Sequence, residues 1–204
     1  MDFKNYAEKE WLQWMDQLSD HDYVVIDNFL PRAILQNVLS FFNNYLGEFS
    51  KAGIGTDMKH QIRTNIRGDH TYWLNPYQHP ELREVWELID ETKAALNTFC
   101  FLSLTGAEFH LVHYPKGARY EKHIDQFEHR KNRMISMVIY LNEKWSDEDG
   151  GKLELFLANG ALKKVEPVAC RCVLFKSASV PHAVAEVNKS RYSLTGWFLH
   201  RTGW

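Results

Sequence analysis

Four side chains in the second half of the sequence have the types and spacing of a metal site with an anion-binding partner. His123 and Asp125 are two residues apart, so on a β-strand both would project from the same face. His182 follows Pro181 at the start of a later predicted strand, which can return the chain beside the first pair. Two imidazoles and one carboxylate on a triangular face suit a non-haem Fe(II) centre with open positions, and zinc would accept the same atoms.

Arg191 narrows the chemistry that such a centre would perform. It begins an alternating face of the last predicted strand, which continues with Ser193, Thr195 and Trp197. An arginine inside a barrel needs an anionic partner, and this strand carries no carboxylate. Because a guanidinium fits a carboxylate through two parallel hydrogen bonds, a dicarboxylic cosubstrate explains the whole set: it chelates the metal at one end and pairs with Arg191 at the other. Tyr140, on another predicted strand, can offer its hydroxyl to the same far carboxylate.

The chain pattern predicts the elements that would hold these side chains. From residue 107 onward, eight short segments rich in β-branched and aromatic residues are separated by turns that contain glycine, proline or asparagine. This spacing is typical of a double-stranded β-helix (jelly roll) and not of a parallel α/β sheet. Earlier in the chain, helical patterns cover residues 6–18, 31–45 and 80–99, with a predicted strand at 23–26. We therefore expect a mainly β fold with N-terminal helices packed on one sheet.

Length and composition agree with a globular protein. The 204 residues favour a single domain over 1–204, with a helical part at 1–100 and a jelly-roll core at 107–201. Lys plus Arg (24) nearly balance Asp plus Glu (26), so no overall basic field favours a nucleic-acid partner. No run approaches the roughly 20 apolar residues that span a bilayer, and the N-terminus has no secretory signal pattern. With three cysteines and no disulfide framework, we expect a cytoplasmic protein that does not bind membranes.

The combined motifs resemble the prolyl 4-hydroxylase superfamily of Fe(II)- and 2-oxoglutarate-dependent dioxygenases. The resemblance is closest to the prolyl hydroxylases of hypoxia-inducible factor and covers roughly residues 60 to 200. The motifs that carry it are His123-Ile-Asp125, His182, Arg191-Tyr-Ser, Ile66-Arg67-Gly68-Asp69 with Trp73, His113-Tyr114-Pro115 and Val138-Ile-Tyr140-Leu-Asn142.

This resemblance implies roles for individual residues. Fe(II) would bind to the catalytic residues His123, Asp125 and His182. The distal carboxylate of 2-oxoglutarate would bind to Arg191 and Tyr140, in a pocket lined by Tyr114, Thr195 and Trp197. The substrate entrance would lie near Arg133, Arg67 and Asp69, with the glycine-rich segment 47–60 as a mobile lid.

The implied reaction is hydroxylation of a prolyl residue in a protein or peptide, with O2 consumed and succinate and carbon dioxide released. Ascorbate is the expected reductant, and a translation factor is a candidate substrate. Two alternatives stay open: hydroxylation of a free amino acid or small metabolite, and a non-catalytic metal-binding jelly-roll module. The net charge of −2 disfavours a nucleic-acid demethylase, and no pattern indicates an oligomeric state.

Overall fold

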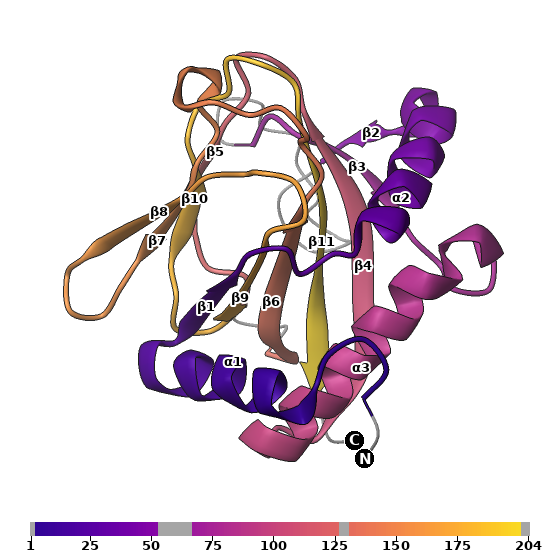
Figure 1. Ribbon diagram of the computed structural model, residues 1–204. Coiled ribbons are helices and arrows are strands. Elements are labelled where there is room, and N and C mark those ends of the chain that lie inside the picture. Colours follow the sequence, from indigo (N-terminus) through magenta and orange to yellow (C-terminus); the bar gives the residue numbers. More distant parts are fainter. Residues whose placement is uncertain (1–2, 53–66, 127–130, 201–204) are drawn as a thin grey trace.

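Two antiparallel sheets face each other, and the helices lie on the outer side of the larger sheet (Figure 1). The computed structural model describes residues 3–52, 67–126 and 131–200. The helices of this part are α1 (Glu8–His21), α2 (Arg32–Tyr45), η1 (Leu46–Glu48), η2 (Pro80–Leu82), α3 (Arg83–Cys100) and η3 (Asp147–Asp149). The strands are β1 (Tyr23–Ile26), β2 (Ser50–Lys51), β3 (His70–Trp73), β4 (Leu104–Tyr114), β5 (Tyr120–His123), β6 (Arg133–Tyr140), β7 (Leu153–Phe156), β8 (Leu162–Val165), β9 (Cys172–Lys176), β10 (His182–Val184) and β11 (Arg191–His200).

The strand order confirms the expected mainly β fold with N-terminal helices. The larger sheet has the order β1-β9-β6-β11-β4-β3-β2, and the smaller has the order β5-β10-β7-β8. Strands β4, β6, β9 and β11 form the wall of the larger sheet that faces the smaller one. Because β5 and β10 are neighbours with His123 directly opposite His182, two distant parts of the chain meet inside the barrel.

The N-terminal part contains more strand than its sequence pattern predicts. It contributes β1, as predicted, but also β2 and β3, which extend the larger sheet beyond β4. These two strands are too short to show an alternating apolar pattern, and they become part of the sheet because β3 pairs with β4 and β2 pairs with β3. Within the glycine-rich segment 47–60, the described residues form the end of η1 and strand β2, while residues 53–60 lie outside the described part.

Alternation along the strands of the larger sheet produces two apolar cores. On β6, Ile135, Met137 and Ile139 pack toward the helices together with Trp11 of α1, Phe42 of α2 and Leu88 of α3. The other face of the same strand directs Val138 and Tyr140 into a core between the sheets, which also contains Phe175 of β9 and Leu155 of β7. Burial of each such large side chain contributes roughly 1.5–3 kcal/mol, so the strands that carry the site are held rigidly from both sides.

The first helix is tied to the third by a buried carboxylate. Glu91 of α3 accepts hydrogen bonds from the backbone of Lys4, Asn5 and Tyr6 and from the indole Nε1 of Trp11. These groups are otherwise unpaired donors near the start of α1, so Glu91 fixes how this helix sits on α3. In the described part of the chain, no helix has the length and apolar character needed to cross a membrane.

Strands β4 and β11 approach each other closely at Gly196. A Cβ atom there would lie 2.4 Å from the carbonyl oxygen of Glu108 and 2.4 Å from the ring of Phe109. Backbone atoms cannot yield at that distance, so only glycine fits at this point in the longest strand pair of the fold.

Candidate active site

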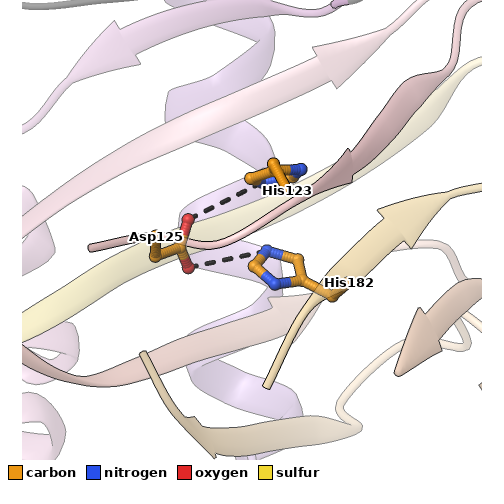
Figure 2. A group of neighbouring side chains, drawn as sticks. All are labelled: His123, Asp125 and His182. Carbon is orange, nitrogen blue, oxygen red and sulfur yellow. Dashed lines mark ion pairs between the residues drawn. The ribbon is translucent and has the colours of Figure 1, made fainter. Parts of the chain in front are cut away.

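The predicted metal ligands meet inside the barrel. The ligand atoms of His123, Asp125 and His182 all lie within 4.8 Å of one another (Figure 2). Nε2 of His123 is 3.7 Å from Oδ1 of Asp125, and Nε2 of His182 is 3.5 Å from Oδ2. His123 comes from the end of β5 and His182 from the start of β10, where the two are direct cross-strand partners. Two imidazoles and a carboxylate therefore converge on one small volume.

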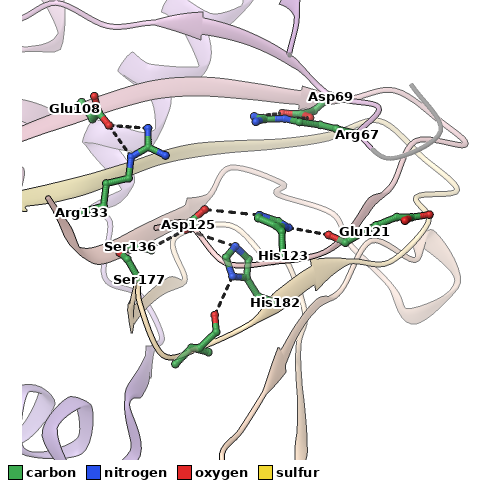
Figure 3. A network of polar contacts seen from close by, with 11 residues as sticks. Arg67, Asp69, Glu108, Glu121, His123, Asp125, Arg133, Ser136, Ser177 and His182 are labelled. Carbon is green, nitrogen blue, oxygen red and sulfur yellow. Dashed lines mark hydrogen bonds and ion pairs between the residues drawn. The ribbon is translucent and has the colours of Figure 1, made fainter. Parts of the chain in front are cut away.

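Each imidazole is oriented by a backbone carbonyl. Nδ1 of His123 lies 2.7 Å from the carbonyl oxygen of Glu121, and Nδ1 of His182 lies 3.1 Å from that of Val180 (Figure 3). A carbonyl can only accept, so Nδ1 carries a proton in both rings, and in the neutral form of each ring the lone pair is on Nε2. Both Nε2 atoms face Asp125, which is the orientation that metal-binding histidines require.

The protonation states also suit a divalent cation. Burial, reinforced by the neighbouring His182, lowers the pKa of His123 to about 3, so this imidazole is neutral at pH 7. Burial opposes ionisation of Asp125, but the imidazoles of His182 and His123 and a hydrogen bond from Ser136 outweigh it and lower the pKa of this carboxyl. Metal ligands must be deprotonated, and the neutral imidazole of His123 and the favoured carboxylate form of Asp125 meet this requirement.

One correction concerns the position of Asp125. The sequence pattern placed it with His123 on a single strand, but β5 ends at His123 and Asp125 lies in the bend that follows. The carboxylate reaches the site because a hydroxyl on β6, that of Ser136, holds it at 2.6 Å. The convergence that the sequence predicted is confirmed, whereas the strand geometry used to explain it is wrong.

The triad lies in the wall of a cavity of about 480 Å³ between the sheets. This cavity is also lined by most of the other residues singled out from the sequence: Arg67, Asp69, Tyr114, Arg133, Arg191, Thr195 and Trp197. Tyr140 is not among the lining residues, because it is fully buried behind the wall, within the apolar core between the sheets.

Arg191 and Tyr140 form a buried polar group for which residues 3–52, 67–126 and 131–200 supply no carboxylate partner. Arg191 is 2% exposed, and its Nε has no hydrogen-bond partner among the described residues; nor does the hydroxyl of Tyr140. The guanidinium carbon lies 5.0 Å from the ring centres of both Tyr114 and Tyr140. Burial raises the pKa of Tyr140 to about 12, an effect that the positive charge of Arg191 opposes, so its hydroxyl stays protonated and can donate. A buried cation beside such a donor fits an anionic ligand, and a carboxylate satisfies both.

The predicted entrance residues are held by ion pairs (Figure 3). Arg133 pairs with Glu108 at 2.7 Å, and its guanidinium lies 3.4 Å from the ring centre of Trp197. Arg67 pairs with Asp69 at 2.7 Å and lies over the ring of Tyr120, 4.8 Å from its centre. Each arginine is therefore fixed in place beside an aromatic wall of the cavity.

Two groups of residues in the site were not singled out from the sequence. His110 is 1% exposed; its ring stacks on that of Trp197, at 5.3 Å between ring centres, and contacts the tilted ring of Trp73 at 4.6 Å. Burial, with the charges of Arg67 and Arg133, lowers the pKa of His110 to about 3. Its place follows from alternation, because it lies four residues before Tyr114 on β4. The second group, Ser136 and Ser177, gives no sequence signal, since its importance depends on contact with Asp125.

Taken together, this donor set suits the iron and 2-oxoglutarate chemistry expected from the sequence. Two histidines and one carboxylate leave three positions of an octahedral ion open, as in Fe(II) oxygenases. In the wall of the same cavity, Arg191 offers a positive charge to a carboxylate, and the hydroxyl of Tyr140, buried beside this guanidinium, offers a hydrogen bond. A zinc hydrolase would have no evident use for that second group.

Comparison with known proteins also indicates an iron- and 2-oxoglutarate-dependent oxygenase. The family model described as the 2OG-Fe(II) oxygenase superfamily matches residues 109–199. A prolyl-4-hydroxylase from Pseudomonas putida is 36% identical, with 94% of this chain and 100% of that chain covered and a TM-score of 0.85. A prolyl hydroxylase from Trichoplax adhaerens, solved with a hypoxia-inducible-factor oxygen-degradation-domain peptide fragment, is 26% identical, with 94% and 90% covered and a TM-score of 0.86.

A more distant structure shares the fold alone. The non-haem α-ketoglutarate-dependent epimerase of nogalamycin biosynthesis is 9% identical, with 96% of this chain and 83% of that chain covered and a TM-score of 0.71. Since the fold supports more than one reaction, the assignment depends on the near relatives and on the side chains of the site. On both grounds, this chain belongs to the 2-oxoglutarate- and iron(II)-dependent oxygenases, in their prolyl 4-hydroxylase group.

Proposed function

We propose that this protein hydroxylates a prolyl residue of a protein or peptide, using Fe(II), 2-oxoglutarate and O2. The proposal rests on one cavity that holds both the triad and the buried Arg191, whose Nε has no hydrogen-bond partner in the described part of the chain. The relatives described above support a prolyl substrate, and one of them was solved with a peptide.

Each residue of the site has a separate part in this proposal. His123, Asp125 and His182 would hold the ferrous ion. When bound, iron and 2-oxoglutarate supply the oxidation of an unactivated C–H bond by O2, with release of succinate and carbon dioxide. Arg191 and Tyr140 bind the distal carboxylate of 2-oxoglutarate.

The remaining lining residues shape the cavity around the two ligands. Tyr114 and Thr195 line the wall beside Arg191, and Trp197 continues the same face of β11. At the entrance, Arg133 and the pair of Arg67 and Asp69 are already ordered, so they can orient a substrate chain without first being immobilised.

An exposed aromatic residue at the cavity suits a peptide. Trp73 lines the cavity yet is 52% exposed, and it stacks on buried His110. A flat, partly exposed ring offers an apolar surface to a prolyl ring and to neighbouring residues of an extended chain. Ascorbate as reductant, a translation factor as substrate and a cytoplasmic location accompany the proposal as predictions from the sequence.

The direct test supplies the purified protein with Fe(II), 2-oxoglutarate and ascorbate and compares a proline-containing peptide pool with free proline. We expect peptide-dependent succinate formation and, by mass spectrometry, the gain of one oxygen atom on a prolyl residue. Hydroxylation of free proline alone would instead establish the small-metabolite alternative. Metal binding without succinate from either pool would favour the non-catalytic module.

A further inference from the structure

Two serine hydroxyls are buried beside the metal triad. Ser136 lies on β6 and is 1% exposed, and Ser177 directly follows β9 and is fully buried. Oγ of Ser136 is 2.6 Å from Oδ2 of Asp125 and 2.8 Å from Oγ of Ser177 (Figure 3). Buried hydroxyls are costly without partners, and here each one is paired.

The direction of these hydrogen bonds follows from the carboxylate at the end of the chain. A metal-binding carboxylate is deprotonated, so its oxygens only accept, and Ser136 donates its one hydroxyl proton to Oδ2 of Asp125. The oxygen of Ser136 is then free only to accept, so Ser177 donates to it. A chain of donors in one direction strengthens each member, and it ends on one oxygen of the metal-binding carboxylate.

We propose that Ser136, supported by Ser177, is a positioning residue that restricts Asp125 to a single metal-binding oxygen. This inference rests on the proposed function. An octahedral ion held by three protein atoms has three further positions, two for the keto-acid end of 2-oxoglutarate and one for oxygen. A second carboxylate oxygen would occupy one of them. By engaging Oδ2 and fixing the plane of the carboxylate, Ser136 keeps that position available.

The strand context explains why Asp125 needs this support. Because Asp125 lies beyond the end of β5, no strand pairing fixes its backbone. Ser136, in contrast, is paired on both sides, with Trp197 of β11 and Phe175 of β9. The rigid strand therefore supplies the orientation that the bend does not.

The test uses Co(II) as a probe, under anaerobic conditions and without substrate. The visible spectrum of the Co(II) protein reports its coordination, and titration with 2-oxoglutarate gives the dissociation constant. We expect Ser136→Ala to alter the spectrum before 2-oxoglutarate is added and to weaken 2-oxoglutarate binding roughly 10-fold, the effect of one charge-assisted hydrogen bond. Ser177→Ala should alter the Co(II) spectrum and weaken 2-oxoglutarate binding in the same direction but to a smaller extent. Ser136→Thr, which keeps the hydroxyl, should give the wild-type spectrum.

A matched control is available on the neighbouring strand. Ser193 is equally buried and lines the cavity, but its hydroxyl contacts Thr195 and not Asp125, so Ser193→Ala should leave the spectrum without 2-oxoglutarate unchanged. An unaltered spectrum and an unaltered dissociation constant in Ser136→Ala would overturn the inference, and if that variant does not fold, the same result in Ser177→Ala would do so. A wild-type protein that binds neither Co(II) nor 2-oxoglutarate would instead overturn the proposed function itself.

Discussion

Replacing Tyr140 with phenylalanine tests the cosubstrate site, because it should weaken 2-oxoglutarate binding and at the same time stabilise the protein without ligand. Tyr140 is fully buried and its hydroxyl has no partner among the described residues, so the substitution removes one polar atom and leaves the packing unchanged. If this hydroxyl binds the distal carboxylate of 2-oxoglutarate, the variant loses a hydrogen bond to a charged group, worth about 1.5–3 kcal/mol. The dissociation constant for 2-oxoglutarate should then rise about 10- to 150-fold.

The same substitution should stabilise the protein without ligand. A buried hydroxyl that lacks a partner costs about 1–3 kcal/mol, and removing it recovers part of that cost. A gain of about 1 kcal/mol corresponds to a rise in Tm of roughly 2–4 °C for a chain of this size. Differential scanning calorimetry of the metal-free protein measures this effect, and anaerobic calorimetric titration of the Mn(II) protein measures the affinity.

A second tyrosine-to-phenylalanine substitution, outside the site, serves as the control. Tyr77 is 94% exposed, so Tyr77→Phe removes the same atom from water and should change neither quantity. If Tyr140→Phe bound 2-oxoglutarate with wild-type affinity, the assignment of Tyr140 would be wrong. If affinity and Tm fell together, a general loss of packing would explain the result, and the reasoning from the unpaired hydroxyl would fail.

Three further substitutions test the fold around the site. The pKa of His110 is about 3 in the folded state and near 6.5 in the unfolded state, so between these pH values the unfolded state binds more protons and stability falls as pH decreases. Urea titrations should show that the wild-type protein loses about 2 kcal/mol more stability than His110→Phe between pH 7.5 and 5. Parallel curves of stability against pH for the two proteins would contradict this prediction. Glu91→Gln should cost about 2–4 kcal/mol, because it removes the charge from a carboxylate that accepts hydrogen bonds from the N-terminal segment. Thermal melts should show a far smaller effect for Glu87→Gln on the same helix, because that carboxylate is partly exposed and pairs with the exposed Lys4. Gly196→Ala places a Cβ against the backbone of β4 and should cost 3 kcal/mol or more, and a variant that melts like wild type would refute the close approach.

Most of the site residues could be predicted from the sequence, because residue types and their spacing along a strand are local features. A histidine and an aspartate two residues apart, a later histidine after a turn and an arginine on an alternating strand already specify a metal-binding set and an anion partner. The spacing of short β segments after a helical region likewise predicted the mainly β fold. These features can be predicted without the tertiary structure, because side-chain alternation and turn formation depend on neighbouring residues in the chain.

Other parts of the site depend on which strands become neighbours. His123 and His182 face each other because of the register between β5 and β10, and Asp125 is oriented from β6, a strand that its own sequence context does not indicate. The role of Ser136 and the position of β3 beside β4 are likewise invisible in the chain, since neither has a distinctive local pattern. The sequence thus determined which atoms are available for chemistry. Only the tertiary structure decided which of them touch, because contacts between strands arise from pairing and packing over the whole barrel.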